Sequence, residues 1–146
     1  MRRYLILLLA AAACTDPLPL TGNRYALNSI AGVALPAPYA FNKALNEVIV
    51  ADTLTLGANG KGVREVVYET GAAPAARYRT TDEFTYVVVG DRIQIAFECN
   101  DLASCIAPPH FTGVISASGI TLDHSAVTLE PLIYARVPGT TSGIPE

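Results

Sequence analysis

The sequence predicts an all-β fold, a small antiparallel up-and-down barrel of about eight strands preceded by a signal helix. Short runs alternate between apolar and polar residues, which is the period of a half-buried strand. Turn signals rich in glycine, proline, asparagine and aspartate separate these runs, as in small all-β domains with local hairpins. A β-sandwich is the alternative, but an immunoglobulin-like sandwich usually has a buried tryptophan and this chain has none.

Two hairpins are the clearest of the predicted elements. The first spans residues 83–97 and turns at Gly90-Asp91, and the second spans residues 110–123 and turns at Ser118-Gly119. The alternation in the first hairpin predicts two rows of inward-facing residues. One row is Phe84, Tyr86 and Val88, and the other is Ile93, Ile95 and Phe97. Further core candidates on the other strands are Leu54, Leu56, Val66, Ile120, Leu122 and Leu132.

Four more strand-like runs complete the prediction, at residues 24–35, 47–56, 63–70 and 132–137. In the second of these runs Asp52 interrupts an apolar phase, which predicts a bulge or a bend. The residues that share that phase are Val48, Val50, Leu54 and Leu56. Residues 58–62 predict a hairpin turn, because asparagine and glycine tolerate positive φ. Only residues 39–46 have a helical spacing, and we expect one helical turn or a loop there.

The N-terminus has the layout of a secretory signal peptide. Arg2 and Arg3 precede an apolar run and a tract of alanines. The run is too short for a transmembrane helix, which needs about 20 residues. We therefore divide the chain into a signal peptide at 1–13, a tether at 14–22, a β-barrel domain at 23–137 and a flexible tail at 138–146.

Cys14 directly follows the alanine tract, and a cysteine in this position resembles the lipobox of bacterial lipoproteins. The resemblance implies that the Cys14 thiol carries a diacylglycerol, that cleavage precedes this residue and that the lipid anchors the protein in a membrane. In Gram-negative lipoproteins an aspartate after the cysteine favours retention in the inner membrane. Here that residue is Thr15, so the resemblance implies an outer-membrane location facing the periplasm or the exterior.

The charge balance excludes one class of partner. The formal net charge is −3, and removal of Arg2 and Arg3 with the signal peptide changes it by two units to −5. Binding to nucleic acid needs a basic surface, so nucleic acid is not expected as a partner. The same balance argues against an electrostatic role at the membrane beyond the lipid itself.

Four segments, at residues 22–32, 54–60, 86–95 and 134–136, resemble the small lipocalin-like (calycin-type) β-barrel lipoproteins of bacteria. The resemblance covers most of the chain after the tether and rests on the rhythm of turns and strands. It implies the barrel fold and no particular activity. In such barrels an arginine often covers one end, and Arg136 is placed to do so by laying its stem on Tyr25.

No pattern predicts a catalytic, cofactor or metal site, and we expect no enzymatic activity. Asp123, His124 and Ser125 are the residue types of a hydrolase triad, but adjacent side chains on a strand point to opposite faces. The two histidines, His110 and His124, are far apart in sequence, and a metal site would need carboxylates besides them.

Cys99 and Cys105 remain as a pair once Cys14 is assigned to the lipid. Export places the chain in an oxidising compartment, so we expect these two residues to form a disulfide. A stapled loop loses little entropy on docking, and the enclosed residues Asn100, Asp101 and Leu102 form the candidate binding loop.

These features together predict a lipid-anchored accessory protein of the cell envelope that binds through its surface loops. Its expected partners are the membrane, through the lipid on Cys14, and an unknown protein or a small apolar ligand. Two alternatives stay open at this point: an inhibitor of an envelope-attacking enzyme, and a carrier of a small apolar ligand.

The Cys99–Cys105 disulfide is directly testable. We expect alkylation of the non-reduced, exported protein to leave both thiols unmodified, and reduction to make both reactive, as read from the intact mass. Loss of the bond should cost about 2 kcal/mol of stability, because the loop that it closes is short. Two alkylated thiols before reduction would show that the bond does not form.

Overall fold

The computed structural model describes residues 23–38, 46–71, 74–98, 110–124 and 130–139. The signal peptide, the tether, most of the segment 39–46 and the Cys99–Cys105 loop lie outside these ranges. The strands are β1 (Asn23–Ile30), β2 (Val33–Ala34), β3 (Ala37–Pro38), β4 (Glu47–Leu56), β5 (Lys61–Thr70), β6 (Arg77–Val89), β7 (Arg92–Phe97), β8 (His110–Ile115), β9 (Gly119–His124) and β10 (Leu132–Arg136). One short 3-10 turn, η2 (Ala58–Gly60), is the helical element of the described residues, so the all-β prediction is confirmed.

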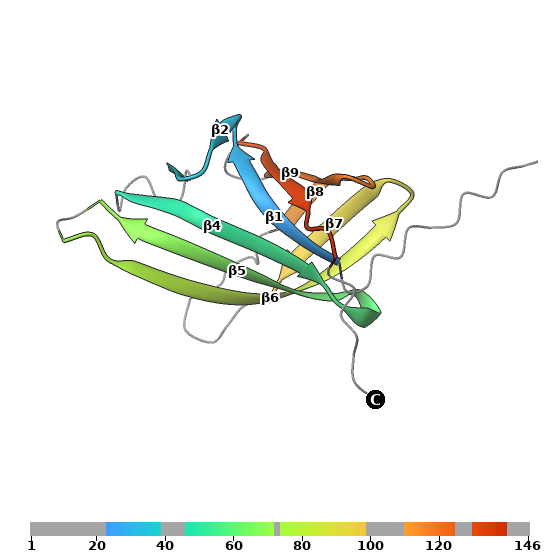
Figure 1. Ribbon diagram of the computed structural model, residues 1–146. Helices are drawn as coiled ribbons and strands as arrows, with labels where there is room; N and C mark the ends of the chain where they lie inside the picture. Colours follow the sequence, from blue (N-terminus) through green and yellow to red (C-terminus); the bar gives the residue numbers. More distant parts are fainter. Residues whose placement is uncertain (1–22, 39–45, 72–73, 99–109, 125–129, 140–146) are drawn as a thin grey trace, which may run out of the picture.

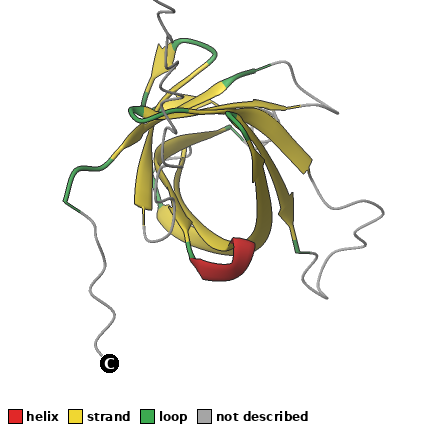
Figure 2. Ribbon diagram, turned by 90° about the vertical axis from the view of Figure 1, so that its right-hand side faces the viewer, coloured by secondary structure: helices red, strands yellow, loops and turns green. Residues whose placement is uncertain are grey.

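Eight of these strands form a closed antiparallel barrel. From β4 to β10 each strand pairs with the next one in the chain, and β1 closes the ring by pairing with both β10 and β4. Figure 2 shows the strands as a ring. This order is the predicted up-and-down barrel, and the sandwich alternative is not formed. The two short strands β2 and β3 add to β1 and β4.

The predicted irregularity near Asp52 is present in β4. The register with β5 shifts between Ile49 and Ala51, which marks a β-bulge two or three residues before Asp52. The predicted phase for Val48 and Val50 is therefore wrong, because the extra residue reverses the alternation on the N-terminal side of the bulge. Glu47 and Ile49 are the buried residues there, and Val48 and Val50 are only partly buried.

The core is built from the inward positions of all eight barrel strands, and every predicted core residue belongs to it or packs against it. Phe84, Phe97 and Phe111 form a chain of edge-to-face rings, with centroids 5.5 Å apart for the first pair and 5.4 Å for the second. Such contacts add to the burial of the rings themselves. Gly62, directly opposite Phe84 on β5, leaves the space that the Phe84 ring occupies, because a Cβ at position 62 would overlap that ring.

The two ends of the barrel differ in their connections. The end at which β4, β6 and β8 finish has only tight turns, at residues 57–60, 90–91 and 116–118, and we call it the hairpin end. The chain enters the barrel at this end, at Asn23, and leaves it there after Arg136. The opposite end has the longer connections, at residues 31–46, 71–76, 98–109 and 125–131, and we call it the loop end. Figure 1 shows β4, β5 and β6 running past the other strands toward the loop end.

Hydrogen bonds tie the hairpin end together. The hydroxyl of Tyr86 donates to the carbonyl of Gly57 over 2.8 Å, which fixes the first turn to the inner face of β6. The amide of Ile115 donates to the carbonyl of Asp91 over 2.8 Å, and the amide of Arg136 donates to the carbonyl of Ser118 over 2.8 Å. The first turn is thus joined to β6 by a tyrosine hydroxyl, and the other two turns are joined to β8 and β10 by main-chain groups.

Removal of a core ring tests this packing. We expect Phe84→Ala to lower the free energy of unfolding by about 3–5 kcal/mol, because it leaves a cavity between Gly62 and Phe97. The matched control is Val87→Ala on the same strand, whose side chain is 61% exposed, and it should change stability by less than about 0.5 kcal/mol. Urea unfolding of the full chain measures both. Equal effects at positions 84 and 87 would contradict the filled core.

Candidate functional site

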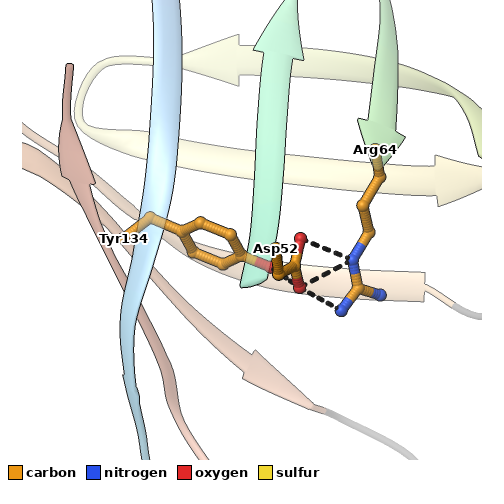
Figure 3. Close-up of polar contacts among 3 residues, drawn as sticks. All are labelled: Asp52, Arg64 and Tyr134. Atoms are coloured by element: carbon orange, nitrogen blue, oxygen red, sulfur yellow. Dashed lines mark hydrogen bonds and ion pairs between the residues drawn. The ribbon is translucent and has the colours of Figure 1, made fainter. Parts of the chain in front are cut away.

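A buried polar cluster of Asp52, Arg64 and Tyr134 lies inside the barrel (Figure 3). Nε of Arg64 donates to Oδ1 and Oδ2 of Asp52 over 3.2 and 3.0 Å, and Nη2 of Arg64 donates to Oδ2 over 2.6 Å. The hydroxyl of Tyr134 donates to the same Oδ2 over 2.8 Å. The Asp52 side chain is fully buried and that of Arg64 is 10% exposed.

Each member of this cluster is turned inward by its own strand. The bulge in β4 restores the phase at which Asp52, Leu54 and Leu56 point inward. Arg64 occupies the inward phase of β5, between Gly62 and Val66, which are also buried.

Tyr134 occupies the inward phase of β10, two residues after Leu132. Because β1 separates β10 from β4, the hydrogen bond between Tyr134 and Asp52 reaches across a strand.

The surroundings of Arg64 favour its charged form. Its guanidinium carbon lies 5.8 Å from the centroid of the Phe97 ring and 5.9 Å from that of Phe111, within the range of cation–π attraction. Burial acts to lower the pKa of Arg64, but Tyr134 and Asp52 outweigh it and raise the pKa well above its usual value. The interior therefore contains a compensated ion pair, in which both charges are hydrogen-bonded.

The chemistry of this cluster suits a structural role, in which it links strands to one another. Both oxygens of Asp52 are hydrogen-bonded, and its side chain is inaccessible to solvent, so it is not placed to transfer a proton to a bound molecule. The three side chains connect β4, β5 and β10 through the barrel interior. The sequence prediction missed the cluster, although an aspartate within an apolar strand and an arginine in the inward phase beside Val66 are its signals.

A second group of polar side chains lies on the inner face nearer the loop end. The rings of Tyr68 on β5 and Tyr78 on β6 are stacked, with centroids 5.1 Å apart. Burial, a hydrogen bond to Glu47 and the charge of Glu47 together raise the pKa of Tyr78 to about 12. Burial also raises the pKa of Tyr68, although the charge of Arg64 acts to lower it.

The site residues predicted from sequence are not among the residues that the structure describes. These are the lipidation site Cys14, the disulfide pair Cys99 and Cys105, and the candidate binding loop Asn100, Asp101 and Leu102. Their positions in the chain nevertheless place them relative to the fold. Cys14 precedes the hairpin end by nine residues, and the loop connects the ends of β7 and β8 at the loop end.

Of Asp123, His124 and Ser125, the structure describes the side chain of Asp123 alone. Asp123 is exposed on β9, and Ser125 lies outside the described ranges. Within those ranges no group of three or more histidine, cysteine, aspartate or glutamate side chains is close enough for a metal ion.

Arg136 lies at the hairpin end, in register with Tyr25 of β1. Its Nη2 donates to Oδ1 of Asn23 over 2.9 Å, and Asn23 is itself buried. Burial raises the pKa of Tyr25, and the charge of Arg136 partly offsets that rise. This position agrees with the expectation that Arg136 covers one end of the barrel beside Tyr25.

The outer surface of the barrel has two different faces. On β4, β5 and the first half of β6 it is charged, with ion pairs from Arg77 to Glu69 at 2.6 Å and from Arg79 to Glu65 at 3.3 Å. On the other side a row of residues in register crosses five strands and contains a single charge. The row is Val89, Arg92, Val114, Thr121 and Ile133.

The chain matches no protein-family model, and a search of curated proteins finds none similar to it in sequence. In the part of the chain that the structure describes, no helix has the length and apolar character needed to cross a membrane. The closed barrel is consistent with a lipocalin-like fold.

Charge removal tests the buried ion pair. We expect Asp52→Leu and Arg64→Met each to lower the free energy of unfolding by about 3–5 kcal/mol, because each leaves one buried charge without its partner. The double variant should cost less than the sum of the two, since it leaves neither charge. Urea unfolding of all four chains gives the coupling energy directly.

The control for this cycle is the exposed pair of Glu69 and Arg77. Alanine substitution of either residue should cost less than about 1 kcal/mol, because solvent screens an exposed ion pair. If the buried and the exposed pairs gave the same values, the cluster would not be a determinant of stability.

The raised tyrosine pKa values predict a loss of stability in alkali. Below about pH 10 both the folded and the unfolded chain have protonated tyrosines. Between pH 10 and about 12 the unfolded chain ionises Tyr78 while the folded chain keeps it protonated, so the free energy of unfolding falls as the pH rises.

Urea unfolding at a series of pH values from 8 to about 12 measures this slope. Tyr78→Phe should make the decline shallower, and Glu47→Gln should lower the pKa of Tyr78 toward 10, as followed by tyrosinate absorbance. An unchanged slope in Tyr78→Phe would contradict the assignment.

Proposed function

We propose that this chain is a lipid-anchored accessory protein of the cell envelope that binds a partner protein through the connections at the loop end of its barrel. The anchor is a diacylglycerol on Cys14, and the binding residues include Asn100, Asp101 and Leu102. The proposal includes membership of the lipocalin-like lipoproteins and a location at the outer membrane.

The filled interior is the observation that favours binding outside the barrel. A barrel of eight strands is just wide enough to be filled by side chains or to contain one small ligand. Here the core contains eighteen buried hydrophobic residues, Tyr134 among them, together with the ion pair of Asp52 and Arg64. If the barrel carried an apolar ligand, the ion pair would line the binding cavity. An apolar ligand there would desolvate the charges without forming hydrogen bonds to them, which is unfavourable.

The arrangement of connections supports the loop end as the binding surface. Four connections longer than the hairpin turns meet at this end, and one of them contains the candidate disulfide and binding loop. Binding residues are commonly found on loops that a rigid scaffold positions. The tight turns at the hairpin end offer much less variable surface.

Two variants of the full chain test the proposal. Cys14→Ser should abolish the association with membranes, as measured by fractionation of cells that express the native and variant chains. A chain with Asn100→Ala, Asp101→Ala and Leu102→Ser should keep the membrane association but lose a cross-linked partner that the native chain captures in envelopes.

The control for the loop variant is Ala117→Ser in the turn between β8 and β9, at the hairpin end. It should capture the same partner as the native chain, because it leaves the loop end unchanged. Capture that survives the loop variant would contradict binding at these residues. Uptake of an apolar fluorescent probe by the native chain would instead favour the ligand carrier.

A further inference from the structure

The charges of the barrel are distributed unevenly between its two ends. At the hairpin end the described residues include four basic side chains, Arg24, Lys61, Arg92 and Arg136, and two acidic ones, Asp91 and Glu65, the second of which reaches Arg24. The other described residues include three basic and eight acidic side chains: Arg64, Arg77, Arg79, Glu47, Asp52, Glu69, Asp82, Glu83, Glu98, Asp123 and Glu130. The negative net charge of the chain therefore conceals a basic end.

Three of the four basic side chains at the hairpin end are exposed and so available to a partner surface. Lys61 and Arg92 are the first residues of β5 and β7, and both are exposed. Arg24 is also exposed, although its Nη2 lies 3.8 Å from a carboxylate oxygen of Glu65. Val89, on the other side of the turn from Arg92, is 73% exposed and adds an apolar contact.

A shallow hollow of about 460 Å³ lies at the same end of the barrel. Its walls include Asn23, Ser118, Arg136 and Pro138, so it combines a guanidinium, a hydroxyl and an amide at the point where the chain enters the barrel. These groups suit a phosphate: arginine and hydroxyl groups donate hydrogen bonds to its oxygens.

The length of the tether places this end near the lipid anchor. Eight residues lie between Cys14 and Asn23, so the two are at most roughly 30 Å apart when the chain is fully extended. The strand β5, with ten residues, is itself about 30 Å long. A tether of that length permits the barrel to turn over, so a further interaction is needed to fix which end faces the membrane.

We propose that the hairpin end docks on the headgroups of anionic phospholipids in the membrane that contains the lipid anchor, so that the loop end points away from it. This inference rests on the proposed lipidation of Cys14. The basic side chains attract the anionic surface, and the acidic remainder of the barrel is repelled by it. Each basic side chain near such a surface favours the docked orientation about fivefold.

The absence of tryptophan from the chain provides a clean probe of this orientation. The lipidated full chain is reconstituted in vesicles that contain phosphatidylglycerol and lipids with a nitroxide on the headgroup. A single tryptophan is introduced as Ala117→Trp at the hairpin end or as Ala75→Trp at the loop end, both of which are exposed positions. We expect strong quenching of the Ala117→Trp chain and little quenching of the Ala75→Trp chain.

Matched charge variants test the electrostatic basis. In the Ala117→Trp chain, Lys61→Gln with Arg92→Gln should lower the ratio of docked to undocked molecules about 30-fold and reduce quenching. Arg77→Gln with Arg79→Gln removes the same charge from exposed positions outside the hairpin end and should leave quenching unchanged or increase it. Phosphatidylcholine vesicles and added salt should both weaken the quenching of the parent chain.

The outcomes separate the inference from the proposal on which it rests. If the chain does not float with vesicles, the lipid anchor is refuted, and the docking proposal is refuted with it. If the chain floats but both tryptophan positions are quenched equally or not at all, only the orientation is refuted. Equal effects of the two charge pairs would refute docking through the basic side chains.

Discussion

The buried ion pair between Arg64 and Asp52 is the constraint on which the interior of this barrel depends. A single charge in such a place would be strongly destabilising, so each residue requires the other, and the hydroxyl of Tyr134 completes the hydrogen bonding of Asp52. The bulge in β4 allows Ile49 and Asp52, which are three residues apart, both to point inward, whereas regular alternation would turn one of them outward. Backbone geometry and electrostatics are therefore coupled in one part of the fold.

The same pair limits what the barrel interior can do. Phe97 and Phe111 lie against the guanidinium, and the Phe84 ring, which contacts Phe97, fills the space toward β6. The polar atoms of the Asp52–Arg64–Tyr134 cluster are hydrogen-bonded to one another. These hydrogen bonds are strengthened because water is excluded from their surroundings. The outside of the molecule has a charged and a nearly uncharged face and two unlike ends, and the proposed binding function would use these surfaces.

The sequence predicts the strands and their order well because hairpins are local. Alternation around Gly90-Asp91 identifies β7 and the second half of β6, although not residues 77–82, and the inward rows from Phe84 to Phe97 follow from the same pattern. The predicted orientation of Val48 and Val50 is wrong because a bulge shifts the inward–outward alternation of β4 by one residue. Alternation in the sequence alone does not indicate on which side of Asp52 this shift occurs. The ion pair and the basic end depend on residues far apart in the chain, which become neighbours only when β1 closes the ring.

The sorting of tight turns to one end and longer connections to the other has a consequence for variation. The tight turns after β4, β6 and β8 set the register of the pairs β4–β5, β6–β7 and β8–β9, so the alignment within these three pairs does not depend on the length of the opposite connections. Insertions and substitutions at the loop end can therefore accumulate without disturbing the alignment within these pairs. One scaffold of this design can present many different recognition loops while its architecture stays the same.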